Sequence, residues 1–253
     1  MITLAMDTSG STASVALFEE IMEEGKREIL IISESFVVLK NIKKSATIGK
    51  ATSQTLMPMI EHILSNANLP LESVDSLACT SGPGSFTGLR IGAATAKGLA
   101  FALGKPLIPI PTLDVLAYNA LTADIGTIIV PLLDARRGQV YGAVYRLTST
   151  FTIERLTDYF AEDIVDLAKK AERVRDESNF SDGGIIFLGS GAENYRDSIS
   201  SIKGACFLPK HYNVPHAACM GYLIPDRMER DFDESNFSLT YLRKSQAERE
   251  KTK

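Results

Sequence analysis

The chain has 253 residues and a formal net charge of −4 at pH 7; 45% of its residues are hydrophobic and 23% are charged. This length fits one large domain or two small ones, and the composition excludes a disordered or low-complexity chain. The acidic balance disfavours a module that binds nucleic acid by itself, so a role on RNA would need the positive charge of a partner.

Cysteine usage and hydropathy point to the cytoplasm. The three cysteines are scattered and lack C-x-x-C spacing, which is typical of a reducing compartment rather than of a disulfide framework. The sequence holds no apolar run long enough for a transmembrane helix, and its first residues lack the pattern of a signal peptide. We therefore expect a cytoplasmic protein without membrane attachment.

Strand patterns open the chain, and a helix follows them. Short apolar runs predict strands at 2–6 and 12–18, joined by a turn. Residues 19–27 are polar and charged and are expected to form a wider turn before two more strand-like segments. Between about residue 49 and residue 66 the spacing of apolar residues becomes that of a helix.

A strand, a glycine-rich turn and a second helix come next. Residues 74–80 predict a buried strand, 81–85 the turn, and 86–103 a helix that Gly104 would end. Small residues recur at every fourth position of this helix, at Gly88, Gly92 and Ala96, with Leu89 beside them. Such a stripe favours close packing over ligand binding, either within the chain or between chains.

The second half of the chain repeats this alternation. Strands are expected there at 127–133, 139–147 and 185–189. Helices are expected at 112–122, 161–174, 192–201 and 215–229. In each half a strand ends in an aspartate, Asp7 or Asp134, and a glycine-containing turn leads into a returning strand. The match suggests two copies of one α/β unit, although any hairpin with Asp and Gly would produce it.

Polar residues at the first strand end are candidates for ligand binding. The carboxylate of Asp7 and the hydroxyl groups of Thr8 and Ser9 could hold a hydrated Mg²⁺ and a phosphate. Local capping of the hairpin turn explains the same residue types and is favoured on these grounds alone.

Two further turns are candidates for anion binding. Gly82, Gly84 and Ser85 would expose backbone N–H groups at a helix start, without a Walker or Rossmann sequence; a tight turn is the alternative. In the second half, Asp134 and Arg136, together with Arg137 and Tyr141, could orient a small anionic ligand. The alternative there is a solvated hairpin tip with a local Asp–Arg pair.

No catalytic set and no metal site are predicted. His211 and His216 are five residues apart with a proline between them, which is not the i, i+4 spacing of a helical zinc pair. The sequence has no G-x-S-x-G elbow and no evident Cys/His pair.

The run from Thr80 to Pro109, TSGPGSFTGLRIGAATAKGLAFALGKPLIP, closely resembles the TsaB family, also called YeaZ. The start of the chain, the segment Leu133–Tyr145 (LDARRGQVYGAVY) and the segment from Thr240 (TYLRKSQAERE) resemble that family as well. The clear matches cover about half of the chain. Residues 19–50 and 174–184 are longer or more charged than is usual in the family, and Thr52 stands where many members have histidine.

The resemblance implies the actin-like, sugar-kinase-like superfold, an α/β fold of two duplicated subdomains, each with a mixed sheet flanked by helices. With the suspected duplication it predicts subdomains at 1–108 and 109–253. It further implies a non-catalytic subunit in the step that places a threonylcarbamoyl group on the tRNA adenosine beside the anticodon. The expected partners are the catalytic paralogue TsaD and the ATPase TsaE, with tRNA reached only through the complex and a homodimer when alone.

The helices at 49–66 and 86–103 are the surface expected to bind TsaD. The predicted contact residues are apolar or small: Leu56, Met57, Ile60, Gly88, Leu89, Gly92 and Ala96. A bulky residue at Gly92 is expected to abolish pairing and leave the monomer folded. No cofactor is expected on this chain itself, and ATP or ADP with Mg²⁺ would sit at the partner complex.

Two rival functions remain from the sequence. A self-sufficient nucleotide-dependent enzyme of the same superfold would hold ATP and Mg²⁺ with Asp7, Thr8, Ser9 and the 81–85 turn. A peptidase would need a nucleophile or metal set that the sequence does not present.

Overall fold

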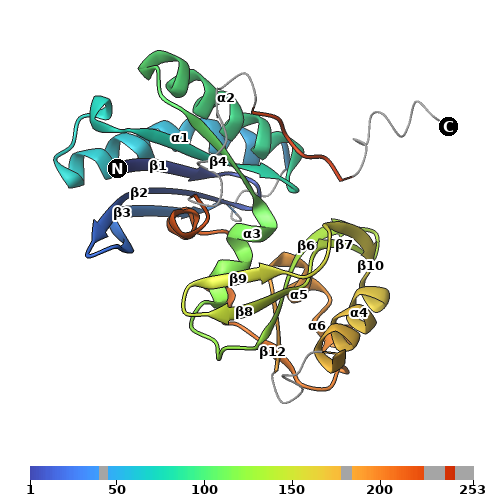
Figure 1. Ribbon diagram of the computed structural model, residues 1–253. Helices are drawn as coiled ribbons and strands as arrows, with labels where there is room; N and C mark the ends of the chain where they lie inside the picture. The colour runs from blue at the N-terminus through green and yellow to red at the C-terminus, as the bar shows by residue number, and fades with distance from the viewer. Residues whose placement is uncertain (40–44, 178–183, 225–236, 243–253) are drawn as a thin grey trace. The chain divides into compact units, whose positions relative to one another are not determined.

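The computed structural model describes residues 1–39, 45–177, 184–224 and 237–242 (Figure 1). The chain divides into unit 1, residues 1–115 with 215–240, and unit 2, residues 116–214 with those from 241 onward. The boundary thus lies after Val115, whereas a division after residue 108 was predicted. Residues 215–240, which were assigned to the second subdomain, return to unit 1.

Unit 1 is built on a five-stranded mixed sheet in the order β3-β2-β1-β4-β5. Its strands are β1 (Ile2–Asp7), β2 (Thr12–Glu23), β3 (Lys26–Val38), β4 (Ser76–Gly82) and β5 (Leu107–Pro111). The first three strands pair antiparallel, and β4 and β5 continue the sheet parallel to β1. The carboxyl ends of β1, β4 and β5 therefore share one edge of the sheet.

The hairpin of β2 and β3 is longer than predicted. Residues 19–27 were expected to form a wide turn, but both strands run through this region and leave only Glu24 and Gly25 between them. Both residues have positive φ, 50° and 76°, which a tight hairpin turn requires. An ion pair between Arg27 and Glu20 and cross-strand pairing keep this polar segment extended.

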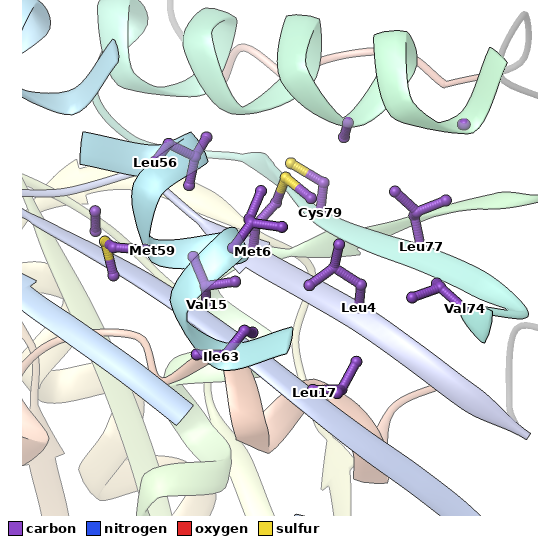
Figure 2. Packing of buried hydrophobic residues seen from close by; sticks show 14 of the residues in the cluster. Leu4, Met6, Val15, Leu17, Leu56, Met59, Ile63, Val74, Leu77 and Cys79 are labelled. Carbon is purple, nitrogen blue, oxygen red and sulfur yellow. The ribbon is translucent and has the colours of Figure 1, made fainter. Parts of the chain in front are cut away.

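Helices α1 (Ser45–Ala67) and α2 (Phe86–Leu103) pack on the sheet through one shared apolar core. Figure 2 shows this core, in which strand residues such as Met6 and Leu17 meet Leu56 and Ile63 of α1. The predicted bounds of α2 are confirmed. Ser85 caps its start by accepting a hydrogen bond from Gly88 N, and Gly104 ends it in the left-handed conformation at φ 62°.

The opposite face of this sheet is covered by the 3-10 helix η4 (Ala217–Tyr222). Ser14 points to that face because side chains alternate along a strand, and its Oγ accepts a hydrogen bond from Ala217 N. A helix was predicted over 215–229; its described part is this short 3-10 helix, and residues 225–229 lie outside the described residues. Farther on, Phe237 is buried in the core and Thr240 N donates to Ser81 O.

Unit 2 repeats the topology of unit 1. Its strands are β6 (Ile128–Arg136), β7 (Gln139–Gly142), β8 (Tyr145–Ser149), β9 (Thr152–Arg155), β10 (Phe160–Asp163), β11 (Ile185–Leu188) and β12 (Ala205–Phe207). The order β10-β7-β6-β11-β12 matches β3-β2-β1-β4-β5, antiparallel on one side and parallel on the other, with β8 and β9 added. The predicted fold class, two duplicated α/β subdomains with mixed sheets, is confirmed.

Helix α4 has the predicted length but begins at Ile164 rather than at residue 161, and the other helices of the second half are shorter than predicted. They are α3 (Thr112–Ala117), η2 (Tyr118–Ala120), α4 (Ile164–Glu177), α5 (Ser190–Asn194), α6 (Arg196–Ile199) and η3 (Lys210–Tyr212); in unit 1, η1 covers Leu71–Ser73. Within the described ranges, no helix has the length and apolar character needed to cross a bilayer.

Candidate functional site

The two helices predicted to bind a partner use their main apolar stripe inside unit 1. Leu56 and Ile60 are fully buried, with 1% and 0% exposure, and both belong to the hydrophobic core of unit 1; Leu56 is labelled in Figure 2. They therefore stabilise the chain's own core, which corrects their expected role as contacts to a partner. Met57, the third predicted anchor, is 36% exposed and lies on the solvent side of α1.

The glycine stripe of α2 also serves packing within the chain. A Cβ atom at Gly88 or Gly92 would overlap with atoms of Thr8, the carbonyl oxygen in one case and Oγ1 in the other. Thr8 Oγ1 donates a hydrogen bond of 2.8 Å to Gly88 O, which fixes α2 over the end of β1. Leu89 and Ala96 are buried on the same side. The expectation that bulk at Gly92 spares the monomer is thereby corrected, because that bulk would meet Thr8.

The outer face of α2 carries a second stripe of small and apolar residues. We define this outer face as Arg90, Ala94, Gly98, Phe101 and Ala102, all of which are exposed. Phe101 is 77% exposed, and a Cβ atom at Gly98 would meet nothing within 4 Å. The spacing from Ala94 to Gly98 to Phe101 to Ala102, in steps of four, three and one residues, was the signal for this stripe, which the prediction missed. Because the inner side of α2 already packs within unit 1, the small and apolar residues on its outer face form a second surface that a partner can cover.

Asp7 lies at the end of β1 with its carboxyl group fully buried. Its Oδ1 accepts hydrogen bonds from Thr80 Oγ1 at 2.7 Å and from Ser9 N at 3.1 Å. Among the described residues, Asp7 Oδ2, Ser9 Oγ and Thr12 Oγ1 are buried without a hydrogen-bond partner. Burial raises the pKa of Asp7, against the opposing effect of the hydrogen bonds from Ser9 and Thr80.

The glycine turn was a candidate for anion binding, with a tight, closely packed turn as its alternative, and the structure shows close packing there. Ser85 N donates to Ser9 O at 2.6 Å, and a Cβ atom at Gly84 would lie 2.5 Å from that same oxygen. A Cβ atom at Gly82, whose φ is 111°, would lie 2.5 Å from Thr240 O. Carbonyl oxygens fill the space beside these glycines and repel an anion. The unpartnered carboxylate and hydroxyl oxygens of Asp7, Ser9 and Thr12 are oxygen ligands of the type that Mg²⁺ takes in proteins.

A second polar cluster fixes η4 to the sheet. His216 stacks on Phe36 with ring centroids 5.1 Å apart, and its Nδ1 lies 3.6 Å from Glu34 Oε1. Glu34 Oε1 also accepts hydrogen bonds from Ser14 Oγ and Ala218 N, both at 3.3 Å. Burial pulls the pKa of Glu34 upward, but His216 and these donors outweigh it and hold the pKa below its ordinary value. His211, the other histidine of that motif, belongs to unit 2.

The predicted polar hairpin of unit 2 is the β6–β7 turn. Asp134 accepts hydrogen bonds from the backbone N–H of Arg136 at 2.8 Å and from Asn194 Nδ2 at 3.0 Å. Its expected ion pair with an arginine side chain is not among the ion pairs of the described residues. Arg136 and Arg137 are exposed at the tip, and Tyr141 lies in β7. Among the described residues, no group of three or more His, Cys, Asp or Glu side chains is arranged to hold a metal ion.

Comparison with known proteins gives a consistent family. The model of the family "TsaD: tRNA N6-adenosine threonylcarbamoyltransferase" matches residues 38–220. The tRNA threonylcarbamoyladenosine biosynthesis protein TsaB of Bacillus subtilis is 30% identical over 204 residues, covering 81% of this chain and 77% of that protein. The TsaB protein of Haemophilus influenzae is 38% identical over 138 residues, 54% of this chain and 51% of that protein.

A solved structure shares the fold over nearly the whole chain. YeaZ from Pseudomonas aeruginosa superposes with a TM-score of 0.70 at 26% sequence identity, covering 95% of this chain and 99% of that one. The TsaB relatives and the YeaZ structure agree on one family, and the family model that matches is the related model of TsaD.

Proposed function

This chain belongs to the TsaB (YeaZ) family of tRNA threonylcarbamoyladenosine biosynthesis proteins, and we propose that it is the non-catalytic subunit that binds and organises a TsaD-type paralogue. In this role it contributes a surface and no reacting group. The reaction it serves is the transfer of a threonylcarbamoyl group to the tRNA adenosine beside the anticodon.

The outer face of α2 carries this proposal. The inner stripe of the helix is fully used by Thr8 and the sheet, so packing inside unit 1 accounts for Gly88 and Gly92 but not for Phe101 and Gly98. An exposed phenylalanine beside a glycine in open space provides an aromatic anchor and a place where a partner helix can come close. Met57 of α1 adds a further exposed apolar side chain.

The histidine content of α1 supports a non-catalytic role. The resemblance to the TsaB family implies that the catalytic paralogue carries paired histidines spaced H-x-x-x-H near the start of this helix. The sequence of α1 here contains one histidine, His62, and its Nε2 lies 3.1 Å from Asn66 Nδ2 within the same helix. The metal and the reacting groups are then supplied by the paralogue.

The outer face of α2 would also serve the expected homodimer. In the absence of TsaD, the outer face of α2 would be covered by a second copy of this chain in a symmetric homodimer. A TsaE-type ATPase would complete the complex, in the cytoplasm. Because the chain has a net charge of −4, tRNA is reached through the complex rather than by this chain alone.

Co-purification with a TsaD homologue tests the proposal. Phe101→Asp places an unpaired charge in the proposed interface, and we expect at least a tenfold loss of affinity with unchanged folding of the variant. Phe151→Asp is the matched control, since Phe151 is 54% exposed at a turn of unit 2. Undiminished binding and tRNA modification with Phe101→Asp would overturn the proposed surface.

A second candidate function is nucleotide binding by this chain itself. The observation that favours it is the group of unpartnered buried oxygens at Asp7, Ser9 and Thr12. Asp7 would hold a hydrated Mg²⁺, which would carry the phosphates of ATP or ADP. Calorimetry of the isolated chain with ATP and Mg²⁺ tests this: Mg²⁺-dependent binding that Asp7→Asn abolishes supports it, and no measurable heat excludes it.

A further inference from the structure

The tip of the β6–β7 hairpin holds two arginines in a backbone conformation that arginine disfavours. Arg136 and Arg137 have φ values of 65° and 59°, and Gly138 follows at 78°. The two-residue turn itself is Arg137-Gly138, a position that favours Asn-Gly, and Arg136 ends β6 beside a register shift. Left-handed geometry costs about 1–2 kcal/mol for an ordinary residue. Such strain persists where the surrounding structure imposes it, and it concentrates at functional sites.

The residues behind the tip hold it in place. Asp134 Oδ1 accepts hydrogen bonds from Arg136 N at 2.8 Å and from Tyr195 Oη at 3.2 Å, while Asn194 Nδ2 donates to Oδ2 at 3.0 Å. Tyr195 Oη in turn accepts from Gly138 N at 3.2 Å. The carboxylate of Asp134 therefore accepts its hydrogen bonds from neutral donors and braces the turn, and no ion pair between it and either arginine is among those of the described residues.

The guanidinium groups of Arg136 and Arg137 have no acidic partner among the described residues, which leaves them available to an anionic ligand. Some of the described arginines form ion pairs, as Arg146 does with Glu154 and Arg175 with Asp176. Within the described ranges, neither Arg136 nor Arg137 has a hydrogen bond or ion pair through its guanidinium group. Asp163 Oδ1, the nearby acidic group on β10, accepts a hydrogen bond from Val165 N. Two adjacent cations are thus exposed on a rigid tip, ready to bind without a cost in ordering the backbone.

We propose that Arg136 and Arg137 form a phosphate-binding tip whose ligand is the phosphodiester backbone of tRNA, an inference that rests on the proposed function. Guanidinium groups bind phosphate through paired N–H donors, and adjacent ones suit a chain of phosphates. Two adjacent exposed cations match the repeated phosphates of a nucleic-acid backbone, which favours the RNA backbone as the source of the phosphate. Asp134 is then a positioning residue, and not the ligand-binding residue that the sequence suggested.

The double variant Arg136→Gly/Arg137→Asn tests the proposal because it separates stability from binding. It installs the residues that the turn prefers, so we expect its unfolding midpoint to rise. In the complex with TsaD- and TsaE-type partners, we expect tRNA affinity to fall about tenfold at low salt. The slope of log affinity against log salt concentration should become shallower by the amount that about one to two phosphate contacts contribute. Fluorescence anisotropy with labelled tRNA at several salt concentrations measures both quantities.

The control is Lys203→Asn/Lys210→Asn, which removes the same charge from exposed sites in unit 2. Loss of tRNA affinity in the arginine variant, but not in the control, supports the tip. Equal effects in both variants, an unchanged affinity, or a loss confined to ATP binding would overturn it. Co-purification with the partners is measured first. Failure of the wild-type chain to assemble with them counts against the proposed function, whereas assembly with unaltered tRNA binding of the arginine variant counts against the tip alone.

Discussion

At the end of β1, the carboxyl group of Asp7 is buried with one oxygen hydrogen-bonded and the other without a partner among the described residues. A buried polar atom of this kind costs about 1–3 kcal/mol of stability. Residues that destabilise a fold in this way are often kept for a ligand. Asp7 is therefore the residue at which stability and function are expected to conflict.

We predict that Asp7→Asn raises the melting temperature at pH 7. Because burial raises the pKa of Asp7, the folded chain holds this proton to higher pH than the unfolded chain does. The stabilising contribution of the group is complete below the unfolded pKa near 3.8 and is lost as pH rises toward and through the folded pKa. The difference in melting temperature between Asp7→Asn and the wild-type chain should become smaller as the pH of the measurement is lowered toward 3. A variant less stable than wild type at pH 7 would contradict this interpretation.

Glu34 is predicted to have the opposite pH dependence. Its pKa is held low by His216 and by hydrogen bonds from Ser14 and Ala218, so its contribution is present above the unfolded pKa near 4.5 and is lost as pH falls through the folded pKa. Since the group is partly exposed, we expect Glu34→Gln to cost no more than about 1 kcal/mol at pH 7. Urea unfolding at pH 7 and at pH 4 measures the difference, which should be smaller at the lower pH.

Along α2, the two faces of one helix give a matched pair of glycine substitutions. Gly98→Ala should stabilise unit 1 by up to about 1 kcal/mol, because its Cβ atom meets nothing and alanine has the higher helix propensity. Gly92→Ala should destabilise it by about 1–3 kcal/mol, because its Cβ atom would meet Thr8 Oγ1. Denaturant unfolding of both variants checks the prediction, and equal effects at the two sites would show that the assignment of the faces is wrong.

The elements differ in how far the sequence defines them. Capping residues at both ends made α2 predictable, since Ser85 and Gly104 are local signals. The faces of α2 were not predictable, because small residues on both sides satisfy the same spacing. The β2–β3 hairpin was missed because its charged residues, such as Glu20 and Arg27, are stabilised as a cross-strand pair that a linear pattern does not reveal.

Across the whole molecule, the duplication was predictable and the long-range contacts were not. Each half carries an aspartate at or near the end of a strand, Asp7 in β1 and Asp134 in β6, before a returning strand, and the two sheets share one strand order. The return of the chain to unit 1 depends on contacts such as Ala217 N to Ser14 Oγ, which join residues 203 positions apart. Likewise, Asp134 is braced by Asn194 and Tyr195, about 60 positions along the chain, and no local pattern indicates such a pair.

The outer face of α2 is the proposed binding surface for a TsaD-type partner. The most direct measurement is the affinity of a purified TsaD homologue for the wild-type chain and for Gly98→Leu, by titration calorimetry. Gly98 has open space around it, so the variant should fold as wild type does, while the leucine side chain keeps a partner helix from approaching. We predict wild-type stability with at least a tenfold weaker affinity. An affinity equal to that of the wild-type chain would contradict the account.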